Sequence, residues 1–93
     1  MRFFIDTHDK TSGTFPEGIT PQQLEEFYKL YQKACEEEGV ISVNINVGLD
    51  KGRAFCLNMA KNEEAVKRVH DKVGLPYDTI TEVKSISPAD LMR

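Results

Sequence analysis

The chain has 93 residues, of which 40% are hydrophobic and 29% charged, and its formal net charge is -3. This length suits one hydrophobic core, so we predict a single domain over residues 1–93 that gains stability from a partner subunit. The acidic excess and the scattered Lys and Arg residues disfavour nucleic acid and anionic membranes as partners. No apolar run approaches the roughly 20 residues of a spanning helix, and Asp6 comes too early for a secretory signal, so we expect a cytoplasmic protein.

The first half of the chain predicts a strand, a loop and a long helix. Aromatic and branched side chains over residues 2–7 indicate the strand, and a polar stretch with Gly and Pro over residues 9–18 indicates the loop. Thr20-Pro21-Gln22-Gln23 matches a capping box with proline at the first helical position. Apolar residues then recur at helical spacing, which predicts an amphipathic helix that stops at Gly39.

The middle of the chain predicts a β-hairpin. Apolar and polar residues alternate over residues 40–49, Asp50-Lys51-Gly52 indicates a turn, and residues 53–59 return as a second strand. We assign the larger apolar side chains to the face that packs in the core, and these are Ile41, Val43, Ile45, Val47, Leu49, Phe55, Leu57 and Met59.

The last third predicts a second helix and a fourth strand. Asn62 fits a helix N-cap, and an apolar stripe runs from there to a stop at Gly74. Residues 77–84 indicate a strand, and residues 87–90 a short final turn. The order βαββαβ is that of the α+β ferredoxin-like fold, which has a four-stranded antiparallel sheet with two helices on one face.

Two helices cover one face of such a sheet and leave the other open to solvent, a ligand or a second subunit. We predict that this open face carries the function. The side chains assigned to it are Phe4, Asp6, His8, Asn44, Asn46, Cys56, Asn58 and Glu82.

Residues on this predicted face suggest a metal site. Asp6 and His8 are two residues apart on one strand and so share a face, and a neighbouring strand could bring Cys56 near them. Carboxylate, imidazole and thiolate together suit nickel, zinc or copper. The same spacing also fits residues that merely end a strand beside a polar loop. His70 is either a further imidazole ligand or a cation at a helix C-terminus, and Cys35 fits core packing.

Several motifs occur in a characteristic order, namely Phe4-Ile5-Asp6-Thr7-His8, Gly18-Ile19-Thr20, Glu38-Gly39-Val40, Phe55-Cys56-Leu57, Val69-His70 and Ile80-Thr81-Glu82-Val83. From Phe3 to about Val83 the chain resembles a family of small bacterial nickel-binding proteins, formerly a domain of unknown function. The resemblance implies a ferredoxin-like fold, a homodimer joined through the sheet faces into an α+β barrel, and nickel ligation. The positions that match the family are Asp6, His8, Cys56 and His70, whereas Tyr28 and Ile45-Asn46 depart from it.

Two other functions stay open on the sequence. Dimeric α+β barrels include monooxygenases and isomerases, and in such an enzyme His8 would be a general base for a small apolar ligand. Asp6 would then orient His8, with Phe4, Tyr28 and Tyr31 around the ligand. The third alternative is that the open face serves only as a dimer contact.

Overall fold

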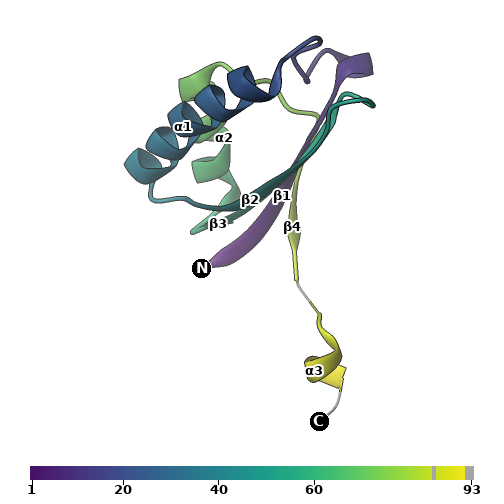
Figure 1. Ribbon diagram of the computed structural model, residues 1–93. Coiled ribbons are helices and arrows are strands. Elements are labelled where there is room, and N and C mark those ends of the chain that lie inside the picture. The colour runs from purple at the N-terminus through teal and green to yellow at the C-terminus, as the bar shows by residue number, and fades with distance from the viewer. Residues whose placement is uncertain (85, 92–93) are drawn as a thin grey trace.

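The computed structural model describes residues 1–84 and 86–91. A sheet with two helices against it forms the body, and a short helix follows (Figure 1). The elements in chain order are β1 (Arg2–Asp9), η1 (Lys10–Ser12), α1 (Pro21–Glu38), β2 (Ile41–Gly48), β3 (Arg53–Ala60), α2 (Glu63–Val73), β4 (Thr79–Val83) and α3 (Pro88–Leu91).

The sheet has the strand order β2-β3-β1-β4, and every neighbouring pair is antiparallel. The helices α1 and α2 lie on the same side of this sheet (Figure 1). The predicted α+β ferredoxin-like fold is therefore confirmed.

Local signals place the helix ends where the sequence predicted them. The Thr20 hydroxyl accepts from the Gln23 amide at 3.1 Å, and the Gln23 side chain accepts from the Thr20 amide at 3.0 Å, which completes the capping box. At the other end of α1, Gly39 has a φ of 69°, a conformation that glycine adopts without a side-chain clash. The Asn62 side chain caps α2.

The faces of β1 and β3 are the reverse of the sequence assignment. On β1 and β3 the buried residues beneath the helices are Phe4, Asp6, His8, Ala54, Cys56, Asn58 and Ala60. The larger apolar side chains of β3 alternate with these residues and face outward, and Phe55 is 47% exposed. Of the residues predicted for the open face, Asn44 and Asn46 do lie there, in register with Leu57 and Phe55.

A bulge makes β2 change face. The register with β3 shifts between Ser42 and Asn44, and an extra residue at such a point reverses the alternation beyond it. Ile41 and Val43, predicted to be in the core, are therefore exposed by 51% and 44%, whereas Val47 is half-buried on the helix side.

The reversal is possible because the buried polar groups are satisfied. Among the described residues, no buried side-chain nitrogen or oxygen lacks a hydrogen-bond partner, so the usual cost of burying polar groups is largely offset. Alternation of small and polar residues on β3 also leaves room for side chains from the helices. The apolar core beside them includes Phe4, Val40, Val66 and Val69.

After β4 the chain leaves the body of the molecule, and α3 projects away from the sheet (Figure 1). Ile86 and Leu91 in this tail are exposed by 68% and 78%. Within residues 1–84 and 86–91, none of the helices is long and apolar enough to cross a membrane.

Candidate metal centre

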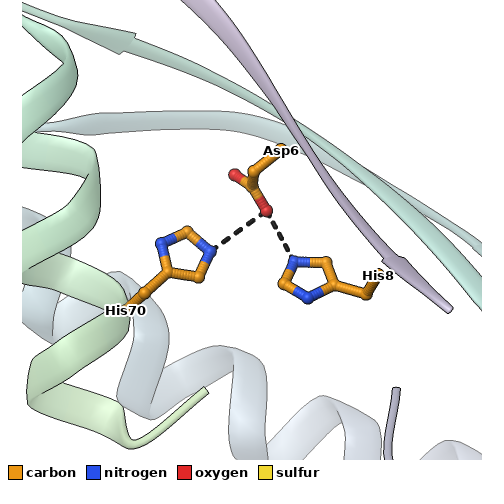
Figure 2. A group of neighbouring side chains, drawn as sticks. All are labelled: Asp6, His8 and His70. Carbon is orange, nitrogen blue, oxygen red and sulfur yellow. Dashed lines mark hydrogen bonds and ion pairs between the residues drawn. The ribbon is translucent and has the colours of Figure 1, made fainter. Parts of the chain in front are cut away.

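Three ionisable side chains meet between the sheet and the helices (Figure 2). Asp6 and His8 come from β1 and His70 from the last turn of α2, and they are only 0%, 4% and 1% exposed. Nε2 of His8 lies 2.6 Å from Oδ1 of Asp6, and Nε2 of His70 lies 3.1 Å from the same oxygen. The three candidate ligand atoms all lie within 4.8 Å of one another.

The periodicity of each element brings these residues together. Residues two apart on β1 project from one face, which puts Asp6 and His8 side by side. His70 stands one helical turn after Val66 and next to Val69, both fully buried, so it belongs to the face of α2 that meets the sheet. His70 does lie in the last turn of α2, as the alternative of a cation at the helix C-terminus predicted, but its side chain is buried and not partly exposed.

Main-chain carbonyls orient both imidazole rings. Nδ1 of His8 lies 2.8 Å from the Pro76 carbonyl oxygen, and Nδ1 of His70 lies 2.8 Å from the Val66 carbonyl oxygen. A carbonyl can only accept, so each Nδ1 carries a proton and donates it. In a neutral ring the lone pair is then on Nε2, which points toward Oδ1 of Asp6 in both residues.

The second oxygen of Asp6 is held from the opposite side. The Asn58 side chain donates to Oδ2 at 2.7 Å, and the Tyr31 hydroxyl donates to the Asn58 oxygen at 3.1 Å. This chain of hydrogen bonds runs from α1 through β3 to β1 and fixes the carboxylate, leaving Oδ1 to face the two histidines.

The contacts within the cluster favour the ionised form of Asp6 and the protonated form of His8. Burial by itself would raise the pKa of Asp6, but the hydrogen bonds from His70 and His8 outweigh it and lower the pKa to about 2. Burial opposes protonation of His8, yet the hydrogen bond and negative charge of Asp6 raise the pKa of His8 above its usual 6.5. The carboxylate therefore stays ionised over the whole range in which proteins are usually stable.

Cys56, the fourth predicted ligand, lies in the β3 position opposite Asp6, but its sulfur is not among the three clustered ligand atoms. Burial, reinforced by the Asp6 charge, raises the pKa of the Cys56 thiol, and a protonated thiol is a poor metal ligand. Cys56 and Cys35 are both free and buried. The open-face placement of Asp6, His8 and Cys56 is wrong, since all three lie beneath the helices.

Sequence reasoning missed the groups that support the cluster. From the sequence, Asn58 is placed on the same face as Asp6 and His8 but has no assigned role, and Tyr31 is placed only around a possible ligand. The register of β3 against β1, which no local signal gives, brings Asn58 within hydrogen-bond reach of Asp6. The carbonyls of Pro76 and Val66 belong to the main chain, so no side-chain type in the sequence points to them.

The donor set fits a divalent transition metal. Two imidazole nitrogens and one carboxylate oxygen are ligands that nickel, zinc, copper and iron accept, and the Nδ1–H bonds to carbonyls supply the outer contacts typical of metal-bound histidine. Aromatic rings shield the site, with Tyr77 and Tyr31 edge-on to His70 at 5.1 and 5.6 Å between ring centroids.

The fold and this cluster together define a class of small ferredoxin-like proteins with a buried pair of histidines around one carboxylate. Within that class the chain belongs to the family described as nickel responsive protein SCO4226-like, whose sequence model matches residues 4–83. Among solved structures, it is similar to SCO4226 from Streptomyces coelicolor A3(2), with 29% identity and a TM-score of 0.77, over 91% of this chain and 99% of that chain. No curated protein sequence matches the chain.

Proposed function

We propose that this protein binds nickel, and that Oδ1 of Asp6, Nε2 of His8 and Nε2 of His70 are its ligands. The observation that carries the proposal is the orientation of the two rings, because both Nδ1 atoms are committed to carbonyls and both Nε2 atoms point at one carboxylate oxygen. The description of the family as nickel responsive selects nickel from the metals that the donor set accepts.

The charge of the cluster supports the same proposal. Without a cation, Nε2 of His8 carries a proton and donates it to Asp6 at 2.6 Å, in keeping with the raised pKa of His8. A divalent ion between the carboxylate and the rings would replace that proton as the partner of the buried Asp6 charge.

Calorimetric titration of chelator-treated protein with nickel, and in parallel with zinc and copper, tests the proposal. We expect one nickel ion to bind per chain, with release to the buffer of the proton that His8 carries in the metal-free protein. Proton release is measured by repeating the titration in buffers with different ionisation enthalpies.

Asp6→Asn provides the decisive variant, and Asp9→Asn is its matched control. Asp9 is on the same strand but pairs with Arg53 at 3.0 Å, away from the cluster. We expect Asp6→Asn to weaken nickel binding by more than about tenfold, because changes to groups that only support the ligands already lower metal affinity by about 10 to 100-fold. We expect Asp9→Asn to leave nickel affinity unchanged. Equal affinities in the two variants would rule out the cluster as the nickel site.

We also propose a homodimer in the cytoplasm. The outward face of the sheet carries exposed Ile41, Val43 and Phe55, together with half-buried Leu57 and Met59, which is an apolar surface that a second copy could cover. Pairing through this face would produce the α+β barrel that the family resemblance implies. The cytoplasmic location is supported by the two unpaired cysteines.

The alternative of an enzyme with His8 as general base has less support. Both ring nitrogens of His8 are engaged, one by the Pro76 carbonyl and one by Asp6. A base must present a free lone pair to the substrate proton, whereas Nε2 of His8 is directed at the Asp6 carboxylate, a direction that suits a cation between the two groups.

A further inference from the structure

A cavity adjoins the metal centre on the side of α1, and nothing in the proposed nickel site uses it. Its volume is about 50 Å³, and its accessible lining is entirely apolar. It lies between the N-terminal half of α1, the β2–β3 end of the sheet and the loop before α1. The apolar side chains that line it include Phe15, Ile19, Leu24, Phe27, Ile45 and Val47.

The inner wall connects this cavity to the cluster. His8 and Cys56 both line it, and Cys56 stands opposite Asp6 in the strand register. A molecule in the cavity would therefore contact the ring of one proposed ligand without displacing the hydrogen bonds of either His8 nitrogen.

The loop that forms the outer wall is anchored. The Thr14 hydroxyl donates to Asp78 at 3.0 Å, the Ser12 hydroxyl donates to the same carboxylate oxygen at 2.7 Å, and Phe15 is only 7% exposed. These bonds tie the segment before α1 to the segment before β4, so the cavity is a feature of the folded chain and not a gap beneath a loose loop.

The volume of the cavity and the nature of its lining indicate what kind of molecule it can bind. A buried water needs two to four polar partners, and an apolar cavity of about 150 Å³ stays dry and takes up benzene or xenon. A cavity one third of that size, whose accessible surface is apolar although His8 and Thr14 contribute to its walls, suits a small neutral molecule better than a charged metabolite. We propose that it binds a neutral apolar molecule of about the size of dioxygen, held against the His8 ring.

Methyl-resolved NMR of the metal-free, full-length protein under increasing xenon pressure tests this proposal. We expect saturable shifts at the methyl groups of Ile45, Val47 and Leu24, and none at Val66 and Val69, which are buried but do not line the cavity. Shifts that are absent, or no larger than those of Val66 and Val69, would overturn it. Because no metal is present, failure of nickel binding leaves this result unaffected.

A substitution that fills the cavity gives a second, independent readout. Ala54→Val adds two methyl groups at a lining position, and Ala60→Val adds them at a buried position on the same face of β3 outside the cavity. We expect the xenon-induced shifts to be lost in Ala54→Val and kept in Ala60→Val. Retention in a folded Ala54→Val protein would contradict the proposal, and if that variant does not fold, the wild-type titration decides.

Discussion

At the scale of single residues, the centre depends on groups that keep a carboxylate charged in the core. The charge on Asp6 is stabilised by two imidazoles on one oxygen and by Asn58 on the other. Burying such a carboxylate without partners would cost several kcal/mol. The residues around Asp6, His8 and His70 are therefore as important for the charge state of the cluster as those three side chains.

Asn58 is the clearest test of that support. We expect Asn58→Ala to lower the free energy of unfolding by about 1 to 3 kcal/mol, because it leaves the Tyr31 hydroxyl and Oδ2 of Asp6 without partners. Nickel affinity should fall about 10 to 100-fold. Urea denaturation and calorimetry measure the two effects, and Gln32→Ala, which replaces an exposed amide on α1, should change neither.

The two cysteines distinguish a three-residue site from a four-residue one. Because burial and Asp6 keep the Cys56 thiol protonated, we expect Cys56→Ser to change nickel affinity no more than Cys35→Ser does. Calorimetry of both variants at neutral pH measures this. A loss of affinity confined to Cys56→Ser would add the thiolate to the ligand set.

The stability of the metal-free protein should depend on pH in a defined way. Asp6 has a pKa of about 2 when folded, so its contribution, on the order of 2 kcal/mol, is present above the unfolded pKa of about 3.9 and is lost as pH falls below it. His8 has a raised pKa, so its contribution is complete below about pH 6.5 and is lost as pH rises through the folded value.

Urea midpoints of chelator-treated protein should therefore be highest between about pH 4 and 6.5. The decline above that range should be smaller in His8→Gln, because glutamine does not titrate. Midpoints that increase steadily to alkaline pH in the metal-free protein would contradict the protonated state assigned to His8.

At the scale of secondary-structure elements, the sequence predicted boundaries well and faces poorly. The helix ends follow from residues adjacent in the chain, such as Thr20, Gln23 and Gly39, whose caps form within one turn. The face of a strand depends on which side the helices cover, and larger apolar residues were assumed to lie there. The polar set of Asp6, His8, Cys56 and Asn58 is buried instead, because partners distant in sequence satisfy it.

The same contrast explains the candidate site. The spacing of Asp6 and His8 already indicated one shared face, and this was sufficient to bring them together. The approach of His70 depends on how α2 packs across the sheet, and the bulge in β2 depends on its pairing with β3. Neither has a local signal in the sequence.

The capping box provides a prediction for α1. We expect Thr20→Ala to lower the free energy of unfolding by about 1 kcal/mol, because the Gln23 amide loses its side-chain acceptor. Gln22→Ala, an exposed position in the same first turn, should have little effect. Chemical denaturation of both variants compares them, and equal destabilisation would show that the cap contributes nothing.

At the scale of the whole molecule, the outward face of the sheet should control assembly. Phe55→Glu introduces a charge at the centre of the proposed dimer contact, and Leu30→Glu introduces the same charge on α1, where Leu30 is 61% exposed. We expect the wild-type protein and Leu30→Glu to sediment as dimers and Phe55→Glu as a monomer. Sedimentation of both variants at dimer mass would place the interface elsewhere.

The carbonyls of Val66 and Pro76 belong to the main chain, and every amino acid that keeps the local backbone supplies the same oxygen. Replacing Val66 by another aliphatic residue would leave the tautomer of His70 unchanged. A comparison of homologous sequences would thus show conservation only at Asp6, His8 and His70. It would not reveal the two main-chain carbonyls that orient the rings. Small displacements of α2 or of the segment before β4 would therefore change the direction of the two rings with Asp6, His8 and His70 all retained.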